Sequence, residues 1–473
     1  MLDVAALTLS LALPWVAGTL VVLALCRRAG RASWLQGAGY GYVLGAVACT
    51  LGMRLLSAAG VGWSLPLLAM PVLAAAAALL WPARRCLSPR SVPNSTTPAV
   101  HRAWTLPALL RGLYWACLAL IAVRLGGLAL QIAWSTLLPW DAWSQWATKA
   151  RVWFEYGRIV PFVTQQEWLA SGDPMRFVDM HPQYPATVPL LQAWTCVWLG
   201  RWDESLMNAP WFAVACALAL GFYAQLRRAG ESAPRAMLFT YLLMSLPFLD
   251  IHVALAGTAD VFIAAIYGMA AMSLWQWTRT RERGDLALAL ILALAMVTVK
   301  VEGWLWAATL LPPLAVAVHR RAGLALAATL AASAAAYLVA GPDEMALFGY
   351  VLRTRFSNVS LPLAQHLFVM DNWHLLWYAT VAVIALRWRR LFAADLAPMT
   401  VTMAGAFGLV FVVYFFSSAA GGVDDESLVN RMPLQMVPAL VFYLALLLQP
   451  PAPGQAPGEA RRSSQLQANA ADA

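Results

Sequence analysis

Charged side chains are scarce in this chain. They make up 12% of its 473 residues, while hydrophobic residues make up 61% and the mean hydropathy is +0.65. Soluble globular domains carry about 25% charged residues, so that class of protein is excluded. What the chain has instead is a series of apolar runs of about 17–25 residues, the length that crosses a hydrocarbon core about 30 Å thick.

Cysteine is also rare, with six residues in the whole chain. No two of them have the CxxC spacing that is typical of zinc ligands. A disulfide framework belongs to small secreted domains, whereas these cysteines lie in or beside apolar runs, apart from one in a basic loop. The sequence therefore predicts neither a zinc site nor a disulfide scaffold from Cys26, Cys49, Cys86, Cys117, Cys196 and Cys216.

The N-terminus lacks the basic stretch of a cleavable signal peptide, so we expect the first apolar run to be retained. The fold class that follows is an all-α polytopic membrane protein with about 13 transmembrane helices and a short or re-entrant helix over 187–199. The expected spans are 4–26, 33–57, 62–81, 107–137, 206–226, 236–254, 258–277, 286–300, 304–318, 324–340, 375–388, 398–417 and 433–449.

The net charge of +9 comes from arginines that gather in alternate loops. By the positive-inside rule those loops are cytoplasmic, so the basic residues orient the protein and no nucleic-acid partner is predicted. The N-terminus and three long segments, 138–205, 341–374 and 418–432, are then expected outside, with the C-terminus inside. The inside loops are marked by Arg27, Arg28, Arg31, Arg84, Arg85, Arg90, Arg102, Arg227, Arg228, Arg235, Arg279, Arg281, Arg283, Arg320, Arg321, Arg387, Arg389 and Arg390.

Four regions are expected along the chain. Residues 1–105 form accessory transmembrane helices, and 106–340 form a core that contains the first long outside segment. Residues 341–449 add a second outside loop and the last helices. The tail, 450–473, is rich in Pro, Gln, Ala and Ser, a composition that is typical of disorder. We expect the protein in a bacterial-type inner membrane, with its active site facing the periplasm.

A tryptophan-rich stretch follows the fourth span. Trp143, Trp146, Trp153 and Phe154 recur at spacings of three and four, which places them on one face of a helix. Lys149 and the other polar residues are expected on the opposite face. Such a helix is suited to lie in the headgroup layer with its rings at the interface. Asp141 stands at its start.

Ionisable residues at outside helix ends are the main functional signal, because such groups are costly near a membrane and usually functional. All of the candidates fall on the outside of a topology that was derived from other residues. They are Asp141, His181, Tyr184, Asp260, Lys300, Glu302, Arg353, Arg355 and Arg431.

These residue types predict a site with two halves. Lys300, Arg431 and one of Arg353 or Arg355 are suited to hold a phosphate, because cations beside a low-dielectric wall bind anions strongly. Asp141 is suited to act as general base on an acceptor hydroxyl. His181, Tyr184, Asp260 and Glu302 are further substrate-site candidates. A lipid-linked sugar phosphate, with an anionic head and an apolar tail, fits both the charges and the helices.

The stretch after Asp141, the sequence His181-Pro182-Gln183-Tyr184-Pro185 and the helix start Ala259-Asp260-Val261 resemble the GT-C superfamily of membrane glycosyltransferases. That superfamily includes the protein mannosyltransferases and the lipid A aminoarabinose transferases. The resemblance implies a polyprenyl-phosphate sugar donor, a glycan, lipid or protein acceptor, and transfer on the outer face with inversion. It places the catalytic carboxylate at Asp141 and the donor-phosphate contacts at Lys300 and Arg431.

The chain departs from that pattern in two places. Many members carry an acidic pair where this chain has Asp141-Ala142, so no cofactor is predicted and a divalent metal is left without support. Three spans also precede the helix that normally comes first.

Simpler explanations stay open for six of the site residues, and His181 can be an ordinary loop residue rather than a ligand. Asp141 and Asp260 are good helix-capping residues, Lys300 and Glu302 can pair with each other, and Arg431 can extend to the interface. Two other classes of function also stay open. One is a transporter or flippase for a lipid-linked or anionic substrate, which would place charges on broken helices near the midplane. The other is a non-catalytic envelope assembly partner.

Overall fold

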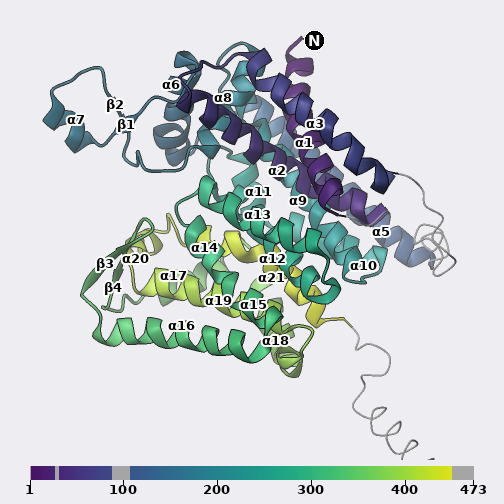
Figure 1. The fold of residues 1–473 in the computed structure, drawn as a ribbon. Coiled ribbons are helices and arrows are strands. Elements are labelled where there is room, and N and C mark those ends of the chain that lie inside the picture. The colour runs from purple at the N-terminus through teal and green to yellow at the C-terminus, as the bar shows by residue number, and fades with distance from the viewer. Residues whose placement is uncertain (1, 27–30, 88–106, 450–473) are drawn as a thin grey trace, which may run out of the picture.

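The computed structural model describes residues 2–26, 31–87 and 107–449, and 76% of it is helical (Figure 1). The predicted all-α class is confirmed. The helices are α1 Leu2–Leu25, α2 Arg31–Ala58, α3 Leu65–Leu87, α5 Ala108–Trp134, α6 Thr148–Tyr156, α7 Gln165–Ser171, α8 Thr187–Leu199, α9 Ala209–Arg228, α10 Ala233–Met244, α11 Pro247–Ala254, α12 Asp260–Thr280, α13 Arg283–Val299, α14 Gly303–Thr309, α15 Leu311–Val318, α16 Arg320–Ala340, α17 Ser360–Ala364, α18 Leu376–Leu386, α19 Ala397–Phe415, α20 Ala419–Asp424 and α21 Arg431–Leu447.

Each predicted span coincides with one helix or with a pair of helices. Within the described residues, eight helices are long and apolar enough to cross a membrane, and nine are if the bent pair α10 and α11 is one span. The helices α8, α18 and α21 and the pair α14–α15 are apolar but shorter. The count of 13 crossings and the orientation remain predictions. The predicted disordered tail and the arginines at 27, 28, 90 and 102 lie outside the described residues.

Two predicted spans are interrupted. Residues 236–254 form α10 and α11, which meet at an angle of 62°. Pro247 is the first residue of α11, and a proline lacks the N–H that would continue the hydrogen bonding of α10. Residues 304–318 form α14 and α15, and the second of these also has prolines in its first turn.

The helices α12 and α21 lie at the centre of the molecule (Figure 1). The helix α12 is buried along almost its whole length and packs against α9, α13 and α21. Gly268 lets α21 approach closely, because a Cβ at that position would lie 2.7 Å from the Cβ of Pro438. This close packing holds the first residues of both helices, Asp260 and Arg431, beside each other.

The N-terminal helices join this core through a close contact between α2 and α9. A Cβ on Gly39 would lie 2.2 Å from the backbone nitrogen of Gly221, so the two helices approach with no side chain between them. Tyr40 adds a hydrogen bond from its hydroxyl to the Met269 carbonyl of α12, at 3.0 Å. The helices α1 and α3 then pack against α2.

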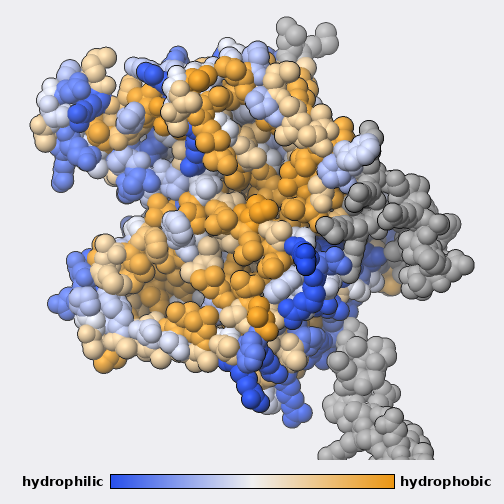
Figure 2. Space-filling model, viewed as in Figure 1, coloured by the Kyte–Doolittle hydropathy of each residue, from blue (hydrophilic) through white to orange (hydrophobic). Residues whose placement is uncertain are grey.

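The segment between α5 and α9 is called the lobe here, and its part with α7 projects from the molecule at the upper left in Figure 1. It contains α7 and two short parallel strands, β1 (Phe162–Val163) and β2 (Phe177–Val178). A second two-stranded sheet is the antiparallel hairpin of β3 (Glu344–Leu347) and β4 (Tyr350–Arg353). Figure 2 shows apolar side chains across the middle of this face and hydrophilic ones over the α7 lobe and at the lower edge.

The tryptophan-rich stretch is helical, as a π-helical turn over Ala142–Ala147 that continues into α6. Its position in the headgroup layer stays a prediction, but the predicted separation of an apolar face from an exposed polar face is wrong in part. Trp146 and Trp153 are buried inside the protein, and so is Lys149, which was expected on the exposed face. Lys149 forms an ion pair with the equally buried Asp179, whereas Arg151 and Glu155 are exposed as predicted.

Candidate functional site

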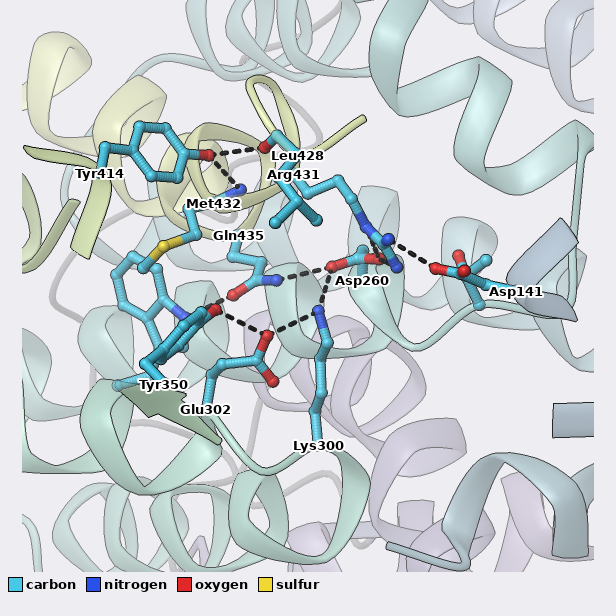
Figure 3. Close-up of polar contacts among 12 residues, drawn as sticks. Asp141, Asp260, Lys300, Glu302, Tyr350, Tyr414, Leu428, Arg431, Met432 and Gln435 are labelled. Atoms are coloured by element: carbon cyan, nitrogen blue, oxygen red, sulfur yellow. Dashed lines mark hydrogen bonds and ion pairs between the residues drawn. The ribbon is translucent and has the colours of Figure 1, made fainter. Parts of the chain in front are cut away.

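Five charged residues from distant parts of the chain meet in one ionic cluster (Figure 3). Each of them stands at the end of an element. Asp141 precedes the π-helical turn, Asp260 is the first residue of α12, and Lys300 follows the last residue of α13. Glu302 precedes α14, and Arg431 is the first residue of α21. All five were predicted site residues.

Asp260 is the centre of the cluster and is fully buried. Lys300 Nζ donates to Asp260 Oδ1 at 2.9 Å, and Arg431 Nη2 lies 2.9 Å from Asp260 Oδ2. Gln435, one turn further along α21, donates to Oδ1 at 2.6 Å. This carboxylate therefore holds two cations in fixed positions, which is a different role from capping α12.

Asp141 lies at the open end of the cluster. Its Oδ2 accepts a hydrogen bond from Arg431 Nη1 at 2.6 Å, and its side chain makes no capping bond to the turn that follows. With 31% of the side chain exposed, it is the most accessible of the five charged groups. The capping explanation of Asp141 is therefore wrong, and Arg431 is held by two carboxylates rather than extended to the interface.

Asp141 is brought to this position by a close backbone contact. Gly257, in the turn between α11 and α12, has φ +101°, and a Cβ there would lie 2.6 Å from the Cβ of Ala142. Glycine is the residue that adopts this conformation without strain. The turn that leads into Asp260 therefore packs directly on the residue after Asp141.

Lys300 and Glu302 also pair with each other, at 3.0 Å. The hydroxyl of Tyr350, in the β3–β4 hairpin, donates to Glu302 Oε1 at 2.9 Å. Burial, together with the negative charge of Glu302, raises the pKa of the Tyr350 hydroxyl well above its ordinary range. Tyr350 is therefore a permanent donor that fixes the hairpin over the cluster.

The charges of the cluster do not balance. Three carboxylates, Asp141, Asp260 and Glu302, face two cations, Lys300 and Arg431, so the formal sum is −1. An anion that approaches these cations therefore competes with the carboxylates that they already bind. Asp141 is the carboxylate that can leave, because it is the most exposed and has one cation partner, whereas Asp260 is fully buried between two.

A polar shell holds the N-terminus of α21 in place. Trp373 Nε1 donates to Asn430 Oδ1 at 2.9 Å, and Asn430 Nδ2 lies 2.8 Å from His366 Nδ1. The Tyr414 hydroxyl accepts from the Met432 N–H at 3.2 Å. The last of these bonds satisfies a backbone N–H that a helix start leaves unpaired, and the first two fix Asn430, the residue before Arg431.

The lobe presents a stack of rings beside the cluster. The His181 and Tyr184 rings stack at 4.6 Å with 9° between their planes, and Trp146 stacks on Tyr184 at 5.3 Å. Lys149 Nζ donates to the His181 carbonyl at 2.7 Å. Burial lowers the pKa of the Lys149 ammonium, and Asp179 opposes this effect. The buried pair of Lys149 and Asp179 thus fixes the position of both predicted ring residues.

The structure does not bring the other two predicted cations into the cluster. Arg353 pairs with Glu344 inside the hairpin at 3.0 Å, and 44% of its side chain is exposed. Arg355 is exposed as well. Their predicted contact with phosphate therefore gains no support from the geometry.

Sequence reasoning missed the neutral members of the site. Gln435, Tyr350 and Trp306, which donates to Gln435, were not predicted. Gln435 had a detectable signal, since it is an amide inside an apolar span, four residues after Arg431 and therefore on the same helix face. Tyr350 had none, because its partner is 48 residues away.

Each carboxylate of the cluster has at least one cation as partner. Across the described residues, no three or more His, Cys, Asp or Glu side chains gather as metal ligands would.

Comparison with known proteins adds no assignment, because no family model, curated protein or solved structure matches this chain. The resemblance to the GT-C superfamily therefore stays a prediction, carried by the residues quoted for it.

Proposed function

We propose that the protein is a membrane glycosyltransferase that moves a sugar from a polyprenyl-phosphate donor to an acceptor on the outer face of the membrane. The observation that carries this proposal is the ionic cluster itself. A candidate base, Asp141, shares Arg431 with the buried carboxylate that also holds Lys300. The candidate base and the anion-binding groups are thus in direct contact. Transfer of a sugar from a phosphate to a hydroxyl requires both to act at one place.

The proposed reaction is a displacement at the anomeric carbon. The acceptor oxygen attacks that carbon from the face opposite the phosphate, and its proton passes to the Asp141 carboxylate. The bond between the anomeric carbon and the phosphate oxygen breaks, and polyprenyl phosphate leaves with one more negative charge. Lys300 and Arg431 stabilise that charge, because charge-assisted bonds strengthen as it develops.

The excess of carboxylates suggests how donor binding prepares the base. A donor phosphate that reaches Arg431 competes with Asp141 for Nη1, the group that now holds Asp141 Oδ2. Once the phosphate replaces it, Asp141 is free to accept a proton from the acceptor. The ion pair between Asp141 and Arg431 is then the resting state, and it keeps the base inactive until the donor is bound.

The alternative, a transporter for a lipid-linked or anionic substrate, is favoured by one observation. The helices α10 and α11 form a broken span, and Asp250 of α11 pairs with Arg124 of α5. Broken helices with charged groups are typical of transporters. The central cluster belongs to other elements, however, and stands at helix ends, so we prefer the enzyme.

The test uses purified protein in nanodiscs with a radiolabelled polyprenyl-phosphate sugar. Lys300→Ala and Arg431→Ala should each weaken donor binding by about tenfold or more, since loss of a charge-assisted bond costs about 1.5–3 kcal/mol. Arg353→Ala is the matched control, because that side chain pairs within the hairpin. Unchanged donor affinity in both cluster variants would place the phosphate elsewhere.

Mass spectrometry of envelope glycans from a deletion strain identifies the sugar, and unaltered glycans would contradict the proposal.

A further inference from the structure

A second polar site lies outside the ionic cluster, between α5 and α11. It is a cavity of about 430 Å³ lined by one face of each helix. On α5 the lining residues recur at spacings of three and four, as one helix face requires. The lining residues are Arg124, Gly127, Leu128, Gln131, Asp250, Ile251, Ala254 and Leu255.

Arg124 is the cation of this cavity, and its partners explain why it stands in an apolar span. Its Nε pairs with Asp250 Oδ2, and its Nη2 donates to the Ser245 carbonyl at 3.0 Å. Ser245 follows the last residue of α10, where the bend leaves carbonyls without their helical partners. His374 Nε2 lies 3.1 Å from the same carbonyl, so Arg124 stands at the level of the second outside loop rather than at the midplane.

These contacts leave part of Arg124 unused. The Nη1 group makes no bond to any residue that the structure describes, and 36% of the side chain is exposed. The amide of Gln131, two turns along the same face of α5, is likewise exposed and makes no side-chain bond to a described residue. Both groups therefore have donors to offer inside the cavity.

The surface around the cavity is apolar and exposed, as a lipid-facing surface would be. Val123 is 74% exposed and Leu130 is 52% exposed on α5, and Ile251 is 43% exposed on α11. Hydrocarbon offers no partner for an arginine or an amide, and such groups at a membrane face are costly unless they are paired. An occupant must therefore pair with Arg124 and also cover the apolar surface. An amphiphile does both, with an anionic head for Arg124 and acyl chains against α5.

We propose that the groove between α5 and α11 binds the phosphate head of an outer-leaflet phospholipid, with Arg124 as the anion-binding group and Gln131 as a second donor. Arginine is suited to this because its planar fork can serve a carboxylate and a phosphate together. The neighbouring recess, lined by Ser135, Thr136 and Pro139, shares Ala254 and Leu255 with the cavity. The residues that line the two hollows thus continue past the end of α5 to Pro139, two residues before Asp141.

The test measures lipid binding and needs no catalytic activity, so its outcome is separate from that of the proposed function. The full chain in detergent is titrated with phosphatidylglycerol and followed by native mass spectrometry. Arg124→Gln should weaken binding by about tenfold. Asp250→Asn should tighten it by several fold, because Arg124 loses its competing carboxylate. Arg151→Gln, which removes an exposed arginine of the lobe, should leave binding unchanged.

Two further arms test the chemistry of the ligand. Diacylglycerol with the same chains, which lacks the phosphate, should bind at least tenfold more weakly than phosphatidylglycerol. Soluble glycerol phosphate should bind weakly too, because it lacks the chains. The proposal would be overturned if either ligand bound as tightly as phosphatidylglycerol. It would also be overturned if Arg124→Gln bound phosphatidylglycerol as tightly as the wild type. If Arg124→Gln does not fold, Arg124→Gln/Asp250→Asn removes the whole ion pair, and wild-type binding by that variant would overturn it as well.

Discussion

At the scale of single residues, the position of Asp260 explains the rest of the cluster. A fully buried carboxylate with donors from Lys300, Arg431 and Gln435 is held on every side. Burial of a charge is unfavourable unless it is paired and hydrogen-bonded. Asp260 meets both conditions, and it therefore acts as the structural anion that holds the two cations in place.

Asp260→Asn should destabilise the protein strongly. The change leaves Lys300 and Arg431 without their common anion, and breaking a buried ion pair costs about 3–5 kcal/mol. Unfolding by SDS titration in mixed micelles measures the free energy of unfolding. Glu302→Gln is the matched control, with an expected cost of about 1–2 kcal/mol, since Lys300 keeps Asp260. If Asp260→Asn cost no more than Glu302→Gln, Asp260 would not be the central anion.

The residues of the cluster could be predicted because ionisable groups are rare in this chain and stand at helix ends. Their pairing could not. Lys300 bonds Asp260 across 40 residues, and Arg431 bonds Asp141 across 290. The sequence favoured phosphate as partner of both cations, whereas carboxylates from other elements occupy them. The packing of α12 against α21 determines which groups lie next to the two cations, and local sequence does not encode that packing.

At the scale of elements, apolar length predicted where helices form, and Pro247 marks where one of them breaks. Amphipathic spacing was less reliable for the tryptophan-rich stretch. It placed Lys149 opposite the aromatic stripe, but Lys149 is buried together with Trp146 and Trp153, while Arg151 and Glu155 are exposed. Amphipathic patterning describes a helix beside a single boundary. It does not describe a helix such as α6, in which a polar residue pairs with the segment that follows the helix.

Lys149→Met should destabilise the lobe by about 3–5 kcal/mol, because it leaves Asp179 as a buried charge without a partner. The double variant Lys149→Met/Asp179→Leu should recover much of that loss, since an apolar pair of similar volume can replace a buried ion pair. Limited proteolysis between α7 and α8 reports the stability of the lobe. If the double variant were cut as fast as the single one, the ion pair would not be what fixes the lobe.

At the scale of the whole molecule, the loops that are predicted to lie outside converge on the ionic cluster. The hairpin reaches Glu302 through Tyr350, the lobe carries Asp141, and the first residue of α21 is Arg431. This convergence depends on the arrangement of spans that charge patterning predicts, with basic loops in the cytoplasm.

The orientation can be tested with single cysteines in a cysteine-free background. Ser171→Cys, at the exposed end of α7, should react with a membrane-impermeant maleimide in intact cells. Ser232→Cys, exposed in the loop between α9 and α10, should react only after the membrane is permeabilised. The reverse labelling pattern would place the ionic cluster on the cytoplasmic side and contradict the proposed use of an outer-face donor.

The central claim is that Asp141 is a base which Arg431 holds inactive until donor phosphate replaces it. One experiment on purified Asp141→Asn addresses it directly, by measuring donor affinity and sugar transfer on the same preparation. Transfer should fall by about 10²–10⁴-fold, the contribution of a general base, while the donor binds as tightly as in the wild type or several fold more tightly. Asp173→Asn, an exposed carboxylate of the same lobe, should leave both unchanged. Wild-type turnover in Asp141→Asn, or weaker donor binding, would contradict the account.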